Sequence, residues 1–324
     1  MEQRHEQHYD GSGSKMVTWG RTTKSWGKPH VSREHAAATI TGEEQDVLKA
    51  EDFFELAGNP YAALFAQTTY VWEALRKRSA YLKHHLQGNV AAIRRGEPVI
   101  SKTVVLYGGK PFYTGFEIDT SGKTPQVKKY GVPLEGASII YAGAVLMDDE
   151  IQIGKNTVIE PGALIKGPTI IGDNTEVRQG AYIRGDVLIG NHCVVGHATE
   201  IKSSVMLGGS KAGHFAYIGD SILGRVNLGA GTKVANLKIA GSEITLEIAG
   251  VRYQTGLRKF GAIMADGVET GCNSVTTPGC LLGRGVLLYP NGTARGYYPP
   301  GKIIKVKQAQ EVEDNSAFDQ EAPK

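Results

Sequence analysis

The sequence predicts a mainly β protein, a parallel β-helix preceded by a small region of helical and mixed structure. The main observation is a repeat with a period of six residues. Aliphatic residues stand at every sixth position from Ile153 to Leu207, and Gly often follows them. An α-helix has a period of about 3.6 residues and a strand a period of about 2, so neither alone produces this pattern. A hexapeptide period is typical of a β-helix in which three short strands and three turns form one triangular coil.

The hexapeptide repeat sets the limits of the predicted β-helix. It begins near Ile139, becomes regular by Ile153, and slips by three residues between Leu207 and Ile222. Later aliphatic or small residues continue the pattern to Ala294. We therefore expect the β-helix to span residues 137–306.

An insertion interrupts the repeat at about residues 236–262. Two β-like runs, Glu243–Ile248 and Val251–Thr255, flank Ala249-Gly250. Such runs separated by a short turn containing Gly are typical of a β-hairpin. We expect a hairpin that projects from the coil.

The segment before the repeat, residues 46–136, is predicted to be helical and mixed. Asn59-Pro60 is typical of an N-cap followed by Pro at the first helical position, and an apolar stripe then runs from Leu64 to about Leu86. Because a solenoid needs its terminal apolar face covered, we expect this segment to act as a cap.

The two ends of the chain are polar and show no periodicity. Residues 1–45 predict a disordered or tag-like arm, and residues 307–324 predict a flexible tail.

Composition and charge limit the partners and the compartment that we expect for this protein. The 324 residues carry a net charge of +3 without a long Lys/Arg run, so neither nucleic acid nor a membrane surface is an expected partner. No apolar run approaches the roughly 20 residues that span a bilayer, and no signal peptide is apparent. Three cysteines without zinc-site spacing indicate reduced thiols and a cytoplasmic protein, namely Cys193, Cys272 and Cys280.

A column of cations is predicted on one corner of the coil. Residues three hexads apart should stack about 4.8 Å from one another, which aligns Lys166, Arg184 and Lys202. Three stacked cations repel unless an anionic group compensates them. An anionic ligand, a carboxylate of a neighbouring subunit and solvation at the surface are the three explanations that the sequence leaves open.

A histidine occupies the point at which the repeat slips. Counting in steps of three hexads, a second column reads Glu160, Arg178, Gly196 and His214. A break in a regular solenoid is a place to look for function. Histidine changes charge near neutral pH and can accept a proton from a nucleophile, although most single histidines are structural.

Residues 180–236 resemble the acetyltransferase domain of bacterial bifunctional N-acetylglucosamine-1-phosphate uridylyltransferases/glucosamine-1-phosphate acetyltransferases. The matching strings are Glu200-Ile201-Lys202, Gly209-Ser210-Lys211-Ala212-Gly213-His214, Tyr217-Ile218-Gly219-Asp220 and Val226-Asn227-Leu228-Gly229-Ala230-Gly231. The part from Arg258 onward looks more like archaeal sugar-1-phosphate nucleotidylyltransferases with a similar acetyltransferase helix. Together the resemblance covers about residues 139–306 and implies a left-handed coil and a homotrimer with active sites between subunits.

The resemblance also implies roles for single residues. His214 corresponds to the general base of an acetyl-CoA-dependent N-acetyltransferase in UDP-GlcNAc biosynthesis, which acts on an amino-sugar 1-phosphate such as glucosamine 1-phosphate and needs no metal for acetyl transfer. Arg184 and Lys202 correspond to phosphate-binding positions. The remaining matches are substrate-orienting or thioester-contacting positions, namely Tyr217, Asn227, Asn236 and Ala230.

The sequence departs from the family pattern in two places. The aromatic residue that follows the asparagine is Leu237 here, and the loop lysine after it has no counterpart, so Lys259 is the substitute expected at the cofactor. Residues 1–136 contain no Gly-rich nucleotidyltransferase loop, so we expect no nucleotidyltransferase domain there.

Three alternatives accompany this hypothesis. His192, His197 and His214, beside Ile183-Arg184-Gly185-Asp186, resemble the zinc-binding pattern of γ-class carbonic anhydrases, which would require three converging imidazoles. A non-catalytic trimeric scaffold that binds a separate sugar-phosphate nucleotidyltransferase is the second. Acyl transfer to another sugar, or from another donor, is the third.

Overall fold

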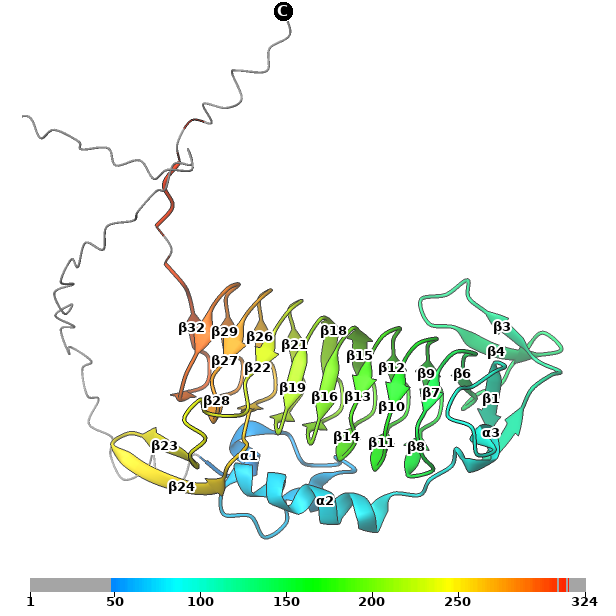
Figure 1. Cartoon of the computed structure of the whole chain (residues 1–324), viewed down its shortest axis with the longest axis horizontal. Coiled ribbons are helices and arrows are strands. Elements are labelled where there is room, and N and C mark those ends of the chain that lie inside the picture. Colours follow the sequence, from blue (N-terminus) through cyan, green and yellow to red (C-terminus); the bar gives the residue numbers. More distant parts are fainter. Residues whose placement is uncertain (1–47, 308, 313, 315–324) are drawn as a thin grey trace, which may run out of the picture. The chain divides into compact units, whose positions relative to one another are not determined.

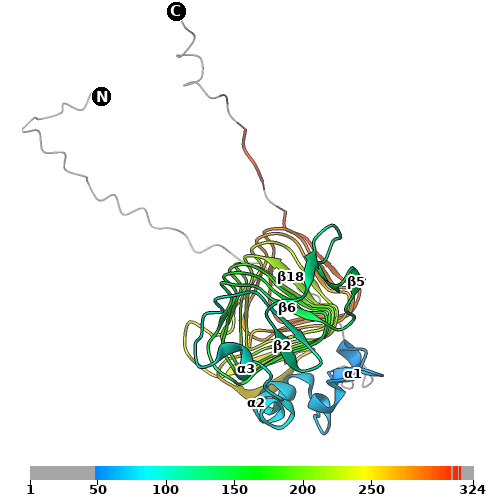
Figure 2. The same ribbon diagram turned by 90° about the vertical axis from the view of Figure 1, so that its right-hand side faces the viewer.

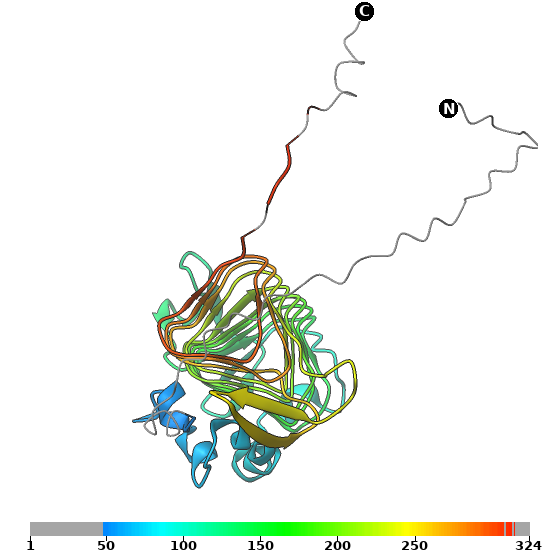
Figure 3. The same ribbon diagram turned by 90° about the vertical axis from the view of Figure 1, so that its left-hand side faces the viewer.

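A computed structural model describes residues 48–307, 309–312 and 314, and it shows a left-handed β-helix. The coil is triangular in cross-section, as the end views show (Figures 2 and 3). The chain passes through three parallel sheets in turn, which we call faces 1, 2 and 3. The predicted disordered arm and most of the predicted tail lie outside the described residues.

Face 1 contains the first strand of each coil. Its order is β6-β9-β12-β15-β18-β21-β26-β29-β32. These strands are β6 (Ser138–Ile140), β9 (Val158–Ile159), β12 (Glu176–Val177), β15 (Val194–His197), β18 (Lys211–His214), β21 (Asn227–Leu228), β26 (Glu269–Thr270), β29 (Leu287–Leu288) and β32 (Ile303–Ile304).

Face 2 contains the second strand of each coil, and face 3 the third. The strands of face 2 are β7 (Val145–Leu146), β10 (Leu164–Ile165), β13 (Tyr182–Ile183), β16 (Glu200–Lys202), β19 (Tyr217–Gly219), β22 (Lys233–Val234), β27 (Val275–Thr276) and β30 (Thr293–Ala294). Those of face 3 are β8 (Ile151–Ile153), β11 (Thr169–Ile171), β14 (Val187–Ile189), β17 (Val205–Met206), β20 (Ile222–Leu223), β25 (Ala262–Met264), β28 (Cys280–Leu282) and β31 (Tyr297–Tyr298).

The inward aliphatic residues stack from coil to coil, as the repeat predicts. Ile165 pairs with Ile183, and Ile183 with Ile201, so each of these coils contains three full hexads. Ile201 then pairs with Ile218, and Ile218 with Val234, so on this face the next coil is one residue short of three hexads and the following coil is two short. The slip in the sequence is therefore a stepwise shortening of two coils.

Two expected inward positions, Leu207 and Ile222, are wrong as a result of this shortening, and Leu223 rather than Ile222 pairs with the inward Met206. Met206, not Leu207, pairs with Ile189 on face 3, because the coil between them has lost one residue. Leu207 is still buried, at the corner that follows the strand.

The N-terminal segment is more broken than predicted. Its elements are α1 (Ala50–Phe53), the 3₁₀ turns η2 (Ala62–Phe65) and η3 (Val71–Glu73), α2 (Ala74–His85) and α3 (Ala91–Arg94). The expectation of a helix starting at Pro60 is wrong. Asn59 Oδ1 accepts a hydrogen bond from the Tyr61 amide at 2.9 Å, but only a 3₁₀ turn follows. Gln67 then adopts a left-handed φ of 57°, which ends any helical path before α2.

This segment covers face 3 rather than one end of the coil alone. The Phe53 carbonyl accepts from the Asp266 amide at 3.0 Å, Ser79 Oγ donates to Asp186 at 2.8 Å, and the Asn89 amide donates to the Ile151 carbonyl at 3.1 Å. These contacts run from late coils back to early ones, and Figure 1 shows α2 lying along the coil.

From β11 to β28 the outward side chains of face 3 are consequently apolar and buried. They alternate with the inward residues along each strand. All are at most 3% exposed, namely Ile170, Leu188, Val205, Ile222, Ile263 and Leu281.

The N-terminal end of the coil is capped by short strands. β1 (Val104–Tyr107) pairs antiparallel with β6 and with β2 (Lys110–Phe112). A separate antiparallel sheet contains β3 (Glu117–Asp119), β4 (Gln126–Lys129) and β5 (Val132–Pro133). β1 therefore lies against the first strand of face 1 at this end of the coil.

The insertion forms the expected hairpin. β23 (Ile244–Ile248) and β24 (Val251–Leu257) pair antiparallel. The hairpin does not project freely, because the Tyr253 ring lies 5.4 Å from that of Tyr70 and 6.0 Å from that of Trp72. Figure 3 shows it beside the N-terminal helices.

In the described residues no helix is long and apolar enough to span a bilayer.

The covering of face 3 generates a stability prediction. Leu188 and Leu164 both precede an inward isoleucine, but Leu188 is fully buried and Leu164 is only half-buried on open face 2. Leu188→Ala should cost about 2–5 kcal/mol of unfolding free energy, as in a protein core, and Leu164→Ala about 1 kcal/mol. Urea unfolding measures both. Equal losses would contradict the covering of face 3.

Candidate functional site

Two columns of polar side chains occupy the outer surface of face 2. Residues before the inward positions pair in register, namely Tyr182, Glu200, Tyr217 and Lys233. Residues after the inward positions form the predicted cation column, since Lys166, Arg184 and Lys202 directly follow the paired Ile165, Ile183 and Ile201.

Carboxylates of the same chain compensate two of these cations. Arg184 Nη1 lies 2.6 Å from Glu200 Oε1, and Lys202 Nζ lies 2.9 Å from Asp220 Oδ2. The hydrogen bond to Glu200 raises the pKa of Arg184, so its charge is constant. Intrachain pairing was absent from the three explanations that the sequence left open. Glu200 could have been found, because it occupies the outward position one coil after Tyr182.

Asp220 connects three of the residues matched by resemblance. Its Oδ2 also accepts a hydrogen bond from Asn236 Nδ2, and Asn236 Oδ1 accepts one from the Tyr217 hydroxyl at 3.4 Å. The side chains of Lys202 and Asp220 are only 15% and 13% exposed. Burial raises the pKa of Tyr217, so its hydroxyl keeps its proton and can donate. The network therefore holds Lys202, Tyr217 and Asn236 in fixed relation.

Gly219 makes this network sterically feasible. A Cβ at this position would lie 2.7 Å from both the Tyr217 hydroxyl and Asn236 Nδ2. Any side chain there would displace one of the two groups.

His214 ends β18, at the corner where face 1 turns into face 2, and its side chain is exposed. It pairs with His197, so the expected column of Gly196 and His214 is wrong by one residue, because this coil is one residue short of three hexads. The Phe215 ring lies 5.3 Å from that of His197 and 6.3 Å from that of His214. The His214 carbonyl accepts from the Gly231 amide at 3.0 Å, which brings Ala230 to the same corner.

The other two predicted residues lie farther apart. Asn227 is on face 1, where it pairs with Lys211 and Glu269, and so belongs to a different face from the cation column. Lys259 is exposed and precedes Phe260, whose amide donates to the Asn236 carbonyl at 2.9 Å. Lys259 is thus near Asn236, at the corner between faces 2 and 3.

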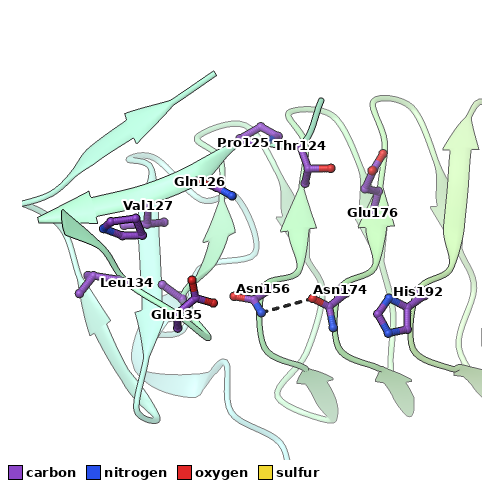
Figure 4. Close-up of a pocket in the computed structure, with 12 residues that line it drawn as sticks. Thr124, Pro125, Gln126, Val127, Leu134, Glu135, Asn156, Asn174, Glu176 and His192 are labelled. Carbon is purple, nitrogen blue, oxygen red and sulfur yellow. Dashed lines mark hydrogen bonds between the residues drawn. The ribbon is translucent and has the colours of Figure 1, made fainter. Parts of the chain in front are cut away.

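A cavity of about 380 Å³ lies elsewhere, between face 1 and the β3-β4-β5 sheet (Figure 4). Asn156 Nδ2 donates to Asn174 Oδ1 at 3.3 Å along its wall, and His192 follows them. None of the residues predicted for the site lines this cavity. Cavity volume alone would therefore not identify the polar surface of face 2 as the candidate site.

The three histidines of the metal hypothesis do not converge within the described chain. His192 lines the cavity, before β15 begins, whereas His197 and His214 pair at the opposite end of β15 and β18. Among residues 48–307 no group of three His, Cys, Asp or Glu side chains is placed to hold a metal ion. All three cysteines are free, and burial raises the pKa of Cys193 to about 11.

Comparisons with known proteins match part of the chain. The family described as the GMPPB C-terminal domain matches residues 165–251. A bifunctional sugar-1-phosphate nucleotidylyltransferase/acetyltransferase of Sulfurisphaera tokodaii is 37% identical over 99 residues, 30% of this chain and 25% of that protein. The bifunctional protein GlmU of Methanococcus vannielii is 37% identical over 83 residues, 25% of this chain and 20% of that protein.

A solved structure, a hexapeptide transferase family protein from Anaplasma phagocytophilum, is 19% identical and covers 52% of this chain and 76% of that one, with a TM-score of 0.20. That score is too low to support a functional comparison. The chain matches only 25% and 20% of the lengths of the two curated relatives. Over 99 and 83 residues respectively, this chain is similar to a bifunctional sugar-1-phosphate nucleotidylyltransferase/acetyltransferase and to a bifunctional protein GlmU.

Proposed function

We propose that this protein is an acetyl-CoA-dependent N-acetyltransferase that acts on an amino-sugar 1-phosphate, with His214 as the general base. The observation that carries the proposal is that the stretch similar to known proteins, residues 165–251, includes both the histidine corner and the polar network of face 2. Arg184, Lys202, Tyr217 and Asn236 all fall within it.

The chemistry requires a base beside a nucleophile. The amine lone pair attacks the thioester carbonyl carbon, the new N–C bond forms, and the C–S bond breaks to release coenzyme A as a thiol. The nitrogen must lose one proton, and His214 accepts it and passes it on to the leaving sulfur. An exposed histidine at the corner of two open faces is accessible to both substrates.

Arg184 and Lys202 have different parts in phosphate binding. The Arg184 side chain is 43% exposed and can exchange Glu200 for phosphate oxygens through charge-assisted hydrogen bonds. Lys202 is mostly buried against Asp220 and contributes its positive charge from a fixed position. Tyr217 and Asn236, held by the same network, then orient the sugar. Ala230 and Lys259 are proposed at the donor.

A homotrimer with sites between subunits agrees with the exposure of the faces. The N-terminal segment occupies face 3 and the β3-β4-β5 sheet lies against the early coils of face 1, so face 2, the later coils of face 1 and the His214 corner between them are the surfaces open to another copy. In such a trimer, Asn227 on face 1 would contribute either to the site of a neighbouring subunit or to the site at its own corner.

Replacement of His214 tests the catalytic assignment. His214→Ala should lower kcat by about 10²–10⁴ in an assay of thiol release from acetyl-CoA with glucosamine 1-phosphate. Its circular dichroism spectrum and oligomeric state should not change, because the side chain is exposed. His192→Ala, on the far side of face 1, is the matched control and should keep its activity. Near-normal turnover by His214→Ala would show that another group is the base.

Replacement of Arg184 tests the phosphate assignment. Arg184→Ala should raise the KM for glucosamine 1-phosphate by about ten- to a hundredfold, the worth of a charge-assisted hydrogen bond, and leave the KM for acetyl-CoA nearly unchanged. The control is Arg178→Ala, which removes a similar ion pair, with Glu176, from face 1. If both variants keep the wild-type KM, the phosphate binds elsewhere.

A further inference from the structure

The cation column on face 2 is longer than one phosphate group requires. Neighbouring coils are separated by about 4.8 Å, so Lys166, Arg184 and Lys202 extend over about 10 Å of the surface. One phosphate of the proposed acceptor can be held by two neighbouring cations. The third cation therefore needs a separate explanation.

Lys166 is the cation without a carboxylate partner. Arg184 pairs with Glu200 and Lys202 with Asp220, whereas no ion pair of Lys166 is present within residues 48–307. The carboxylate of Asp148 at the same corner accepts hydrogen bonds from the Gly167 amide at 2.8 Å and the Glu150 amide at 3.0 Å. That carboxylate is therefore already used by the backbone.

The Tyr182 ring places Lys166 beside Arg184. Lys166 Nζ lies 5.4 Å from the ring centroid, and Arg184 Cζ lies 5.9 Å from it. A cation–π contact at a partly exposed site is weaker than a charge-assisted hydrogen bond to a phosphate oxygen, so the ammonium group can leave the ring for an anion. The ring holds two cations of adjacent coils near one another on the same surface.

Directly beyond Lys166 the column changes from charged to apolar side chains. Met147 is the equivalent residue one coil earlier, since its amide donates to the Ile165 carbonyl at 2.8 Å, and its side chain is 41% exposed. The cations therefore end at Lys166 and an apolar surface follows. Two phosphoryl groups followed by a less polar group would match this order along the face.

We propose that Lys166, with Tyr182 and Arg184, forms a second phosphoryl subsite, so that the preferred acceptor is an amino-sugar 1-diphosphate, as carried by a nucleoside diphosphate amino sugar. This inference rests on the proposed function for the position of the first phosphate, at Arg184 and Lys202. The transfer itself is unchanged. The amine still forms the N–C bond, the C–S bond still breaks, and the diphosphate is not cleaved.

Steady-state kinetics with two acceptors test the subsite. We would measure thiol release from acetyl-CoA with UDP-glucosamine and with glucosamine 1-phosphate. In wild type the KM for UDP-glucosamine should be at least about tenfold lower, the worth of one additional charge-assisted hydrogen bond. Lys166→Ala should abolish that difference and change the KM for glucosamine 1-phosphate by less than about twofold. Lys155→Ala, at the corner between faces 3 and 1, is the control and should change neither KM.

Two outcomes would overturn the subsite and leave the proposed function intact. One is an equal rise of both KM values in Lys166→Ala, which would assign Lys166 to the first phosphate. The other is no preference for UDP-glucosamine in wild type. If neither acceptor supports thiol release, the proposed function fails instead. Calorimetric titration with UDP then tests the subsite independently of activity. Binding of UDP by wild type that is lost in Lys166→Ala would support the subsite. Equal binding of UDP by wild type and Lys166→Ala would overturn it.

Discussion

The stacking of inward aliphatic residues from one coil to the next is the constraint on which the structure depends. Ile165, Ile183 and Ile201 are fully buried and follow one another in register on face 2. Each coil hydrogen bonds to the coils before and after it, so every outward side chain has a position fixed by the inward one beside it. The polar surface of face 2 is therefore a consequence of the core. Cations and carboxylates that are nearly three hexads apart in sequence become neighbours.

The two shortened coils contain several of the residues proposed for the site. Loss of a residue brings His214 beside His197, and Phe215 at this corner has a left-handed φ of 54°, as Ala198 has one coil earlier at 50°. Asp220, with a φ of 48°, occupies the next corner of the same coil and pairs with Lys202 and Asn236. L-residues rarely adopt such backbone angles, so the coil packing must hold them. The site is thus built from rigid strands with strained corners.

The repeat was sufficient to predict the β-helix, the cation column and the hairpin, because each follows from local spacing. The position of His214 in its column was predicted wrongly, since a coil shortened by one residue keeps the same local motifs. The helix expected from Pro60 was also wrong, because an apolar stripe does not reveal a left-handed residue such as Gln67.

The sequence does indicate that face 3 is covered, although the period of six by itself does not show it. Apolar residues precede the inward ones there, as in Ile170, Leu188 and Ile222, and make the strands of this face apolar on both sides. Strands buried on both sides read as continuous apolar runs. Spacing places Glu200 in the outward column beside the cations, but the ion pairs of Arg184 with Glu200 and of Lys202 with Asp220 depend on side-chain geometry that spacing does not give.

The central claim is that this chain transfers an acyl group to the amine of a phosphorylated amino sugar. The most direct measurement is mass spectrometry of the sugar product after incubation of the wild-type protein with acetyl-CoA and an amino-sugar phosphate. The account predicts a product that has gained one acetyl group on nitrogen, with phosphate retained. The account would be contradicted if a folded protein left every tested amino-sugar acceptor unmodified.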